Sequence, residues 1–147
     1  MKSVNIYTDG ACKGNPGAGG YGVILECNGK SKELSGGCAD TTNNRMELLA
    51  VITGLSSLNE SCDVVLYSDS KYVLDSITKK WVYSWKSKGW KKSDGKSALN
   101  VDLWEQLLPL LEKHHVKFVW VKGHDGHPQN ERCDFLATTA AENHKIK

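Results

Sequence analysis

The hydrophobic pattern of this chain changes its period near residue 42, and this change limits the folds that the chain can adopt. Before that point, three short runs of β-type residues are predicted strands: residues 4–8, 21–27 and 32–39. Asn28-Gly29 separates the second run from the third and is a strong hairpin signal. We therefore predict a three-stranded antiparallel meander, in which the first strand ends at Asp9 and the glycine-rich residues 10–20 form a loop.

After residue 42 the period becomes helical, and helices then alternate with short apolar strands. The predicted helices are residues 46–58, 70–80, 100–111 and 130–143, and the predicted strands are residues 64–67 and 116–121. Asn100 is expected to cap its helix, which Pro109 should kink or end early. The order β-β-β-α-β-α-α-β-α predicts an α/β fold, a five-stranded mixed β-sheet with helices on both faces.

The length of 147 residues and the ordinary composition predict one globular domain over residues 1–147. No apolar run approaches the roughly 20 residues that a bilayer requires, and the start of the chain lacks the apolar region of a signal peptide. Five widely spaced cysteines form no zinc or disulfide pattern and are expected to be reduced thiols. These features predict a cytoplasmic protein with no membrane partner.

Positive charge is concentrated in one segment, although the net charge of the whole chain is only +2. Residues 79–96 carry seven lysines and one acid, a net charge of +6, and the rest of the chain carries −4. We expect this segment, over about residues 80–98, to form a basic protrusion on a mildly acidic body. This separation of positive from negative charge predicts a polyanionic partner and a separate acidic site.

Four acidic residues are candidates for that site: Asp9, Glu47, Asp69 and Asp134. Asp9 alone has an explanation as a turn residue, Asp69 as a helix cap and Asp134 as a partner of a helix dipole. However, Asp9 and Asp69 both follow predicted strands, at the edge where open α/β sheets bind ligands. Glu47 lies early in an apolar helix that packs on the sheet, from which it can reach the same edge.

Carboxylates brought this close repel one another, so a cation is needed to hold them together. An all-oxygen set without Cys or His favours a hard cation, Mg²⁺ or Mn²⁺. Such a set suits phosphoryl transfer with two metal ions, and paired carboxylates also serve in glycoside hydrolysis. The lysine-rich segment favours the phosphoryl chemistry, because a glycosidase does not need it.

Six short motifs follow one another along nearly the whole chain: Thr8-Asp9-Gly10-Ala11, Gly14-Asn15-Pro16-Gly17, Gly19-Gly20-Tyr21-Gly22, Thr42-Asn43-Asn44-Arg45-Met46-Glu47, Ser68-Asp69-Ser70, and Gly123-His124 through Asn130-Glu131-Arg132-Cys133-Asp134. Together they resemble bacterial ribonuclease H of type 1. Any one of them is a weak signal, whereas the fourth and the last, correctly spaced, are highly specific.

The resemblance implies a ribonuclease H-like fold and an endonuclease that hydrolyses the RNA strand of RNA/DNA hybrids without sequence preference. It implies that Asp9, Glu47, Asp69 and Asp134 bind metal and that His124 is the family's catalytic histidine, whereas His127 is expected to be structural. Two Mg²⁺ ions per active site with substrate, or Mn²⁺ in their place, would support in-line attack of water and leave 5′-phosphate and 3′-hydroxyl ends. We expect a monomer with no obligate protein partner.

Further residues are expected to bind the hybrid, by resemblance to the family. They are Asn15, Asn43 and Asn44 along the two strands, Thr42 and Asn100 at a DNA phosphate, Lys71 beside the site, and Trp81, Trp85, Lys86, Lys88, Trp90, Lys91 and Lys92 in the basic protrusion. Turn and cap chemistry is the alternative for the amides, and packing is the alternative for the tryptophans. The other two tryptophans, Trp104 and Trp120, are predicted to lie in the core.

Two rival functions use the same residues. A nucleic-acid-binding module on the same fold would bind without cutting, and loss of a carboxylate would favour it, but all four are present. Another two-metal enzyme on this scaffold, such as an integrase or a junction resolvase, is the second rival. The basic protrusion and the string from Asn43 to Glu47 argue against it.

Overall fold

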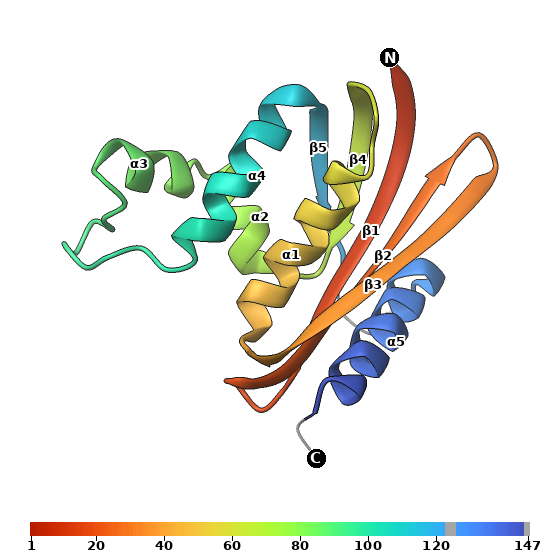
Figure 1. Ribbon diagram of the computed structural model, residues 1–147. Helices are drawn as coiled ribbons and strands as arrows, with labels where there is room; N and C mark the ends of the chain where they lie inside the picture. The colour runs from red at the N-terminus through yellow and green to blue at the C-terminus, as the bar shows by residue number, and fades with distance from the viewer. Residues whose placement is uncertain (123–125, 146–147) are drawn as a thin grey trace.

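The computed structural model describes residues 1–122 and 126–145. Its strands are β1 (Lys2–Lys13), β2 (Gly17–Cys27), β3 (Lys30–Thr41), β4 (Cys62–Ser68) and β5 (His115–Trp120). Its helices are α1 (Asn43–Ser56), α2 (Lys71–Thr78), α3 (Trp81–Ser87), α4 (Val101–Lys113) and α5 (Pro128–Asn143). Figure 1 shows that α3 and the loop after it project from one end of the molecule.

The strands form one mixed sheet in the order β3-β2-β1-β4-β5. The pairs β1–β2 and β2–β3 are antiparallel, whereas β1–β4 and β4–β5 are parallel. This confirms the predicted five-stranded mixed sheet and the order of its elements. The short helix α3, in the basic segment, was not predicted.

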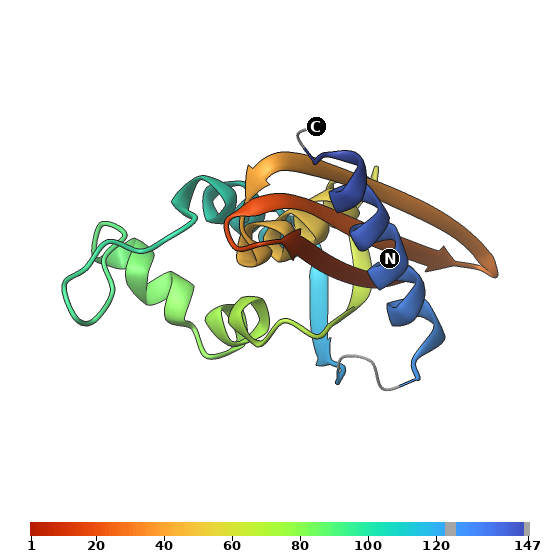
Figure 2. The same cartoon turned by 90° about the horizontal axis from the view of Figure 1, so that it is seen from below.

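Helices cover both faces of the sheet, as predicted. The main core lies on the face covered by α1, α2 and α4, where apolar side chains from β1, β2 and β4 meet these helices. The helix α5 lies across β1, β2 and β3 on the opposite face (Figures 1 and 2). Within the described residues, no helix is long and apolar enough to cross a membrane.

The prediction that the first strand ends at Asp9 was wrong, because β1 continues to Lys13. Residues 10–20 therefore belong largely to the β1–β2 hairpin and not to a loop. The parallel register of β1 with β4 extends from Lys2 to Tyr7, while the antiparallel register with β2 continues to Lys13. Asp9 thus lies just beyond the point where β1 and β4 separate, which is the sheet edge that the sequence analysis expected.

The glycines of β2 allow α5 to approach the sheet closely. A Cβ atom on Gly20 would lie 2.3 Å from the main-chain oxygen of Ala137, and one on Gly22 would lie 2.4 Å from that of Cys133. Both obstacles are main-chain atoms of a helix, so neither can turn away as a flexible side chain would. Close packing of α5, and not a turn, explains this part of the glycine-rich stretch.

We predict that Gly20→Ala lowers the free energy of unfolding by about 1–3 kcal/mol, because the added methyl group forces α5 away from β2. Gly54→Ala is the matched control. Its methyl group would meet only the side chains of Ile6 and Val23, at 3.0 and 3.2 Å. Urea denaturation measures the free energy of unfolding of both variants. If the two variants lose equal free energies of unfolding, the close-packing explanation is refuted.

The start of α4 also differs from the prediction. Asn100 has left-handed backbone geometry, with φ of 61°, and its side chain makes no capping hydrogen bond. Instead its amide oxygen accepts a hydrogen bond from Arg45, and its amide nitrogen donates to the hydroxyl of Tyr72. Pro109 lies on the exposed side of α4, which continues to Lys113, so the predicted early stop was wrong. Water can satisfy the carbonyl group that Pro109 leaves without a partner.

The two tryptophans predicted to lie in the core have different environments. Trp104 is fully buried, and its indole nitrogen donates to the Tyr72 hydroxyl. Trp120 is 47% exposed, so the prediction for this residue was wrong. It is the last residue of β5, which forms one edge of the sheet.

A buried histidine gives the fold a defined dependence on pH. His114 Nδ1 accepts a hydrogen bond of 3.1 Å from the main-chain N–H of Cys62. Burial, assisted by the charge of Lys113, lowers the pKa of His114 below its usual value of 6.5. Folding therefore favours the neutral imidazole, and this contribution is present above pH 6.5 and is lost as the pH falls through the lowered pKa.

The free energy of unfolding of the wild type is expected to fall between pH 7.5 and pH 5. We predict that it falls less in His114→Gln. His115→Gln, which changes the exposed neighbouring imidazole, is the control. Denaturant titrations at several pH values supply the measurement. If the free energy of unfolding of His114→Gln depends on pH as steeply as that of the wild type, this imidazole does not contribute to the pH dependence of stability.

Candidate metal centre and nucleic-acid interface

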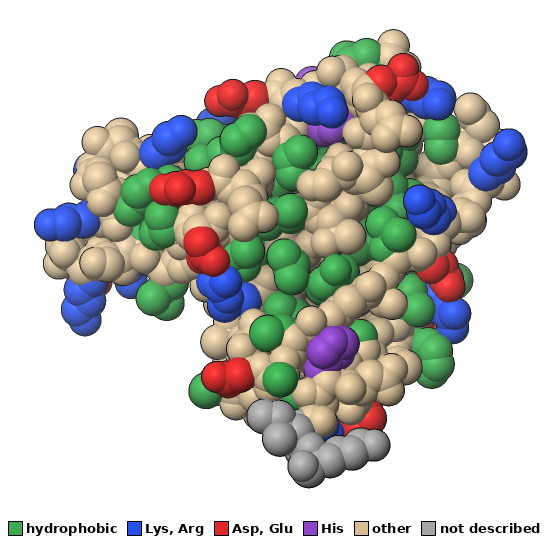
Figure 3. All heavy atoms as spheres, viewed as in Figure 1, with side chains coloured by type: hydrophobic (Ala, Val, Ile, Leu, Met, Phe, Trp, Pro, Cys, Tyr) green, Lys and Arg blue, Asp and Glu red, His purple; other side chains and the backbone are tan. Residues whose placement is uncertain are grey.

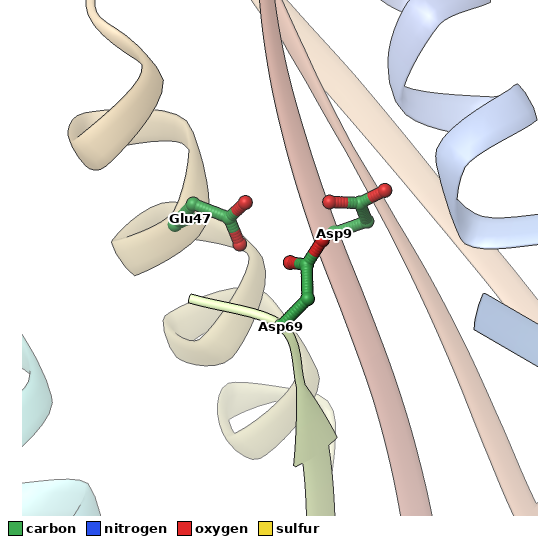
Figure 4. A group of neighbouring side chains, drawn as sticks. All are labelled: Asp9, Glu47 and Asp69. Atoms are coloured by element: carbon green, nitrogen blue, oxygen red, sulfur yellow. The ribbon is translucent and has the colours of Figure 1, made fainter. Parts of the chain in front are cut away.

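Three acidic side chains from three different elements converge at one edge of the sheet. Asp9 comes from β1, Glu47 from α1, and Asp69 from the residue after β4. One carboxylate oxygen from each lies within 4.8 Å of the others. Figure 4 shows that the carboxylates of Glu47 and Asp69 approach that of Asp9. This confirms the predicted convergence of the three side chains at one edge of the sheet.

Close packing between α1 and β1 brings Glu47 to the site. A Cβ atom on Gly10 would lie 2.6 Å from the main-chain nitrogen of Glu47, so only glycine allows the helix to approach β1 at this point. The start of α1 is fixed by Thr42, whose hydroxyl accepts a hydrogen bond from the N–H of Arg45. Glu47 consequently lies in the second turn of α1, directly against β1.

Asp69 is positioned by the turn between β4 and α2. The side chain of Ser70 caps α2 by accepting from the N–H of Val73, so the predicted capping role belongs to Ser70 and not to Asp69. The N–H of Ser70 donates to the hydroxyl of Ser68, which closes the turn around Asp69. The Asp69 carboxylate extends from the end of β4 toward Asp9 (Figure 4).

The site concentrates negative charge in a buried environment. Asp9 is only 8% exposed and Glu47 only 4%. Burial, followed by the charges of Asp69 and Asp134, raises the pKa of Asp9 to about 8. Burial, followed by the charges of Asp9 and Asp69, raises the pKa of Glu47 well above its usual value. Charged carboxylates in such a place require a cation nearby, and a bound cation would reverse these shifts.

The donor set fits a divalent hard cation. Every ligand atom in the cluster is a carboxylate oxygen, which is the donor that Mg²⁺ and Mn²⁺ prefer. The buried Oε2 of Glu47 has no hydrogen-bond partner among the residues that the structure describes. Asp9 Oδ1 accepts from the N–H of Gly10 at 2.8 Å, which holds the carboxylate at the strand. A buried oxygen without a partner is the feature that a coordinated ion explains.

The fourth predicted acid reaches Asp9 from the opposite face of the sheet. Asp134 is half-buried in the second turn of α5. Its negative charge and a hydrogen bond between the two side chains help to raise the pKa of Asp9. It lies outside the cluster formed by Asp9, Glu47 and Asp69. The predicted catalytic histidine, His124, lies outside the described residues.

Several predicted substrate-binding residues lie around the start of α1. The amide oxygen of Asn15 accepts a hydrogen bond from the main-chain N–H of Asn43, so the β1–β2 turn and α1 present their amides together. Asn43 and Asn44 are exposed in the first turn of α1. Arg45 joins this region to Asn100 and forms two hydrogen bonds with Asp102.

The basic protrusion consists of α3 and the loop that leads to α4. Lys86, Lys88 and Lys91 are exposed and Lys92 is half-buried, and lysines project from this end of the molecule in Figure 3. The tryptophans divide into two kinds: Trp85 and Trp90 pack against the core, with the ring of Trp85 edge-on to that of Trp104, whereas Trp81 is exposed.

Trp120, which was predicted to lie in the core, instead pairs with Lys71 beside the acidic cluster. The exposed ring of Trp120 lies 4.8 Å from Lys71 Nζ, in a cation–π contact. The indole nitrogen of Trp120 donates to the main-chain oxygen of Asp69. The position of Trp120 at the end of a strand parallel to β4 could have indicated this contact, because it places Trp120 next to Asp69.

Comparison with known proteins agrees with this geometry. The RNase H family profile matches residues 1–142. The chain is 59% identical over 142 residues to a ribonuclease H of Desulforamulus reducens, which covers 97% of this chain and 89% of the relative. It also resembles the crystal structure of LC9-RNase H1, a type 1 RNase H with the type 2 active-site motif, with a TM-score of 0.86 and 34% identity over 99% of this chain and 74% of that one.

A more distant structure shares the fold. LC11-RNase H1, solved in complex with an RNA/DNA hybrid, is 22% identical to this chain, with a TM-score of 0.69 over 95% of this chain and 97% of that one.

Proposed function

Because the chain belongs to the ribonuclease H family, we propose that it is an endonuclease that hydrolyses the RNA strand of RNA/DNA hybrids without sequence preference. The observation that carries the proposal is the convergence of Asp9, Glu47 and Asp69 at a sheet edge. This cluster supplies acidic ligands for phosphoryl transfer, while the separate basic protrusion supplies cations for a nucleic-acid backbone. The hybrid in the LC11-RNase H1 structure supports the same substrate.

Asp9, Glu47, Asp69 and Asp134 would hold the divalent ions, for which Mg²⁺ is proposed and Mn²⁺ is the alternative. When bound, two such ions activate water and stabilise the charge on the oxygens of the scissile phosphate. Asp9 is the central ligand, since it is near both the α1 side and the α5 side of the site. Glu47 and Asp69 complete the set from α1 and the end of β4.

The remaining residues would orient the hybrid. Asn15, Asn43 and Asn44 can hydrogen-bond 2′-hydroxyl groups and minor-groove edges, which distinguish RNA from DNA. Thr42 and Asn100 are proposed to contact a DNA phosphate. Lys71, two residues after Asp69, would contact the hybrid beside the site. His124 is proposed to accept or relay a proton during the reaction.

The basic protrusion is proposed to bind the DNA strand through phosphate contacts that do not depend on sequence. Lys86, Lys88, Lys91 and Lys92 would contact the phosphates, and Trp81, Trp85 and Trp90 would contact sugars or bases. A monomer without an obligate protein partner is part of the same proposal, as is one catalytic domain over residues 1–147. A cytoplasmic location is supported by the five cysteines, all of which are free thiols.

A panel of four end-labelled substrates tests the proposed function. We expect Mg²⁺-dependent cleavage of an RNA/DNA hybrid, confined to the RNA strand, and no cleavage of single-stranded RNA, RNA duplex or DNA duplex. Salt-sensitive binding of the hybrid without cleavage in Mg²⁺ or Mn²⁺ would instead indicate a non-catalytic binding module. Preferential cleavage of a DNA duplex or junction would indicate a different nuclease on this fold.

A further inference from the structure

A pair of stacked tyrosines lies next to Asp9 and Asp69 along β1 and β4. Tyr7 precedes Asp9 by two residues on β1, and Tyr67 precedes Asp69 by two residues at the end of β4. Residues two apart on a strand point to the same face of the sheet. Tyr7 and Tyr67 are also register partners, and their rings are nearly parallel, with centroids 4.6 Å apart. The stack therefore joins β1 to β4 at the base of the acidic cluster.

His127 rests against both rings of this stack. Its imidazole is 5.9 Å from the ring centroid of Tyr7 and 6.1 Å from that of Tyr67, tilted to each. His127 directly precedes α5, the helix that carries Asp134. Its Nδ1 is buried and has no hydrogen-bond partner among the described residues, and its ring lies beside the two stacked tyrosine rings.

Two hydrogen bonds hold the same end of α5 against the sheet. The thiol of Cys133, next to Asp134, donates to the main-chain oxygen of Tyr7 at 3.3 Å. The side-chain amide of Gln129 donates to Glu26 at 3.4 Å, and Glu26 is also hydrogen-bonded to the Tyr7 hydroxyl. The first two turns of α5 are thus tied to β1 and β2 around the tyrosine stack.

We propose that Tyr67 and His127 are positioning residues, which form with Tyr7 an aromatic platform that fixes Asp134 relative to Asp9 and Asp69. Neither residue touches a reacting atom in this proposal. Each acts through the placement of α5 against β1 and β4. The inference rests on the proposed role of these carboxylates as metal ligands.

The physical need for such a platform follows from the charges above it. Asp9, Asp69 and Asp134 repel one another, and this repulsion favours a wider spacing of the elements that carry them. An aromatic stack resists that widening, because separating the rings exposes buried apolar surface to water. Groups that orient metal ligands in this way contribute to metal affinity without contacting the ion.

The test is Mn²⁺ binding to the full chain without nucleic acid, measured by isothermal titration calorimetry. We expect Tyr67→Ser and His127→Ala to raise the Kd for Mn²⁺ roughly tenfold. Tyr67→Phe should restore the wild-type Kd, because it keeps the stacking ring. His144→Ala, which changes the histidine at the opposite end of α5, is the matched control and should also bind Mn²⁺ as the wild type does.

A second readout separates positioning from a general loss of stability. With saturating hybrid, cleavage by His127→Ala should recover as the Mn²⁺ concentration rises, while KM for the hybrid stays unchanged. A wild-type Kd in folded His127→Ala would overturn the proposal, as would a Tyr67→Phe variant no better than Tyr67→Ser. If Tyr67→Ser does not fold, His127→Ala decides the matter, because it leaves both strands unaltered.

Failure of the proposed function would be visible separately. Wild-type protein that binds Mn²⁺ but leaves hybrids intact would refute the nuclease assignment, while the Kd comparison would still test the platform. Wild-type protein that binds no Mn²⁺ would refute the metal centre and, with it, the platform.

Discussion

Replacing Asp9 by Asn is expected to lower kcat for hybrid cleavage by about a thousandfold, which corresponds to ~4 kcal/mol of transition-state stabilisation. Asp9 lies between Glu47 and Asp69 on one side and Asp134 on the other, so its loss removes the ligand common to both groups. A neutral amide neither balances the charge of a divalent ion nor binds it as strongly. Binding of the hybrid should be retained, since the basic protrusion is unchanged.

The comparison requires single-turnover cleavage and a separate hybrid-binding measurement in the same buffer. Asp63→Asn is the matched control, because Asp63 lies at the opposite end of β4 from Asp69 and pairs with the exposed His115. Full cleavage activity in Asp9→Asn would contradict the proposed metal centre. Loss of binding together with cleavage would indicate that the substitution disturbs more than the metal ligands.

Replacing Lys86, Lys88, Lys91 and Lys92 together by Ala is expected to raise KM for the hybrid about 100-fold near 0.1 M salt. Each lysine that contacts a phosphate contributes roughly one unit to the slope of log Kd against log salt, so this slope should also become shallower. The value of kcat should change little, because α3 and the loop after it project from one end of the molecule (Figure 1), whereas the carboxylates come from β1, α1 and the residue after β4.

A second quadruple variant controls for the change in net charge. It replaces four exposed lysines remote from the basic protrusion: Lys2, Lys30, Lys32 and Lys113. For both variants, KM and the slope of log Kd against log salt are measured between 0.05 and 0.3 M salt, a range of about sixfold. Equal effects in the two would mean that net charge, and not the basic protrusion, governs binding.

Much of the fold follows from the hydrophobic period, because the period reports which side of each element is buried. The change from short strands to alternating helices and strands near residue 42 was sufficient to predict the mixed sheet and its covering helices. The glycine-rich stretch was harder. Turn formation and close helix packing both select glycine, and the helix that packs on Gly20 lies more than 100 residues further along the chain.

The candidate site was predictable to the extent that strand ends determine it. Asp9 lies two residues beyond the paired part of β1 and β4, and Asp69 directly follows β4, so the parallel pairing of these strands places the two residues together. The aromatic platform and the exposure of Trp120 depend on which strands are neighbours and how α5 crosses them, which no local pattern encodes. Asn100 occupies the predicted N-cap position of α4, but its side chain joins Arg45 to Tyr72, contacts with α1 and α2 that the local sequence does not show.

The most direct test of the central claim is to identify the ends of the RNA fragments by mass spectrometry, with Mg²⁺ and again with EDTA. If the carboxylates support attack of water on the scissile phosphate, Mg²⁺ will yield fragments with 5′-phosphate and 3′-hydroxyl ends, and EDTA will abolish cleavage. Fragments that end in a 2′,3′-cyclic phosphate and form equally well in EDTA would mean attack by the RNA's own 2′-hydroxyl, and would contradict the account.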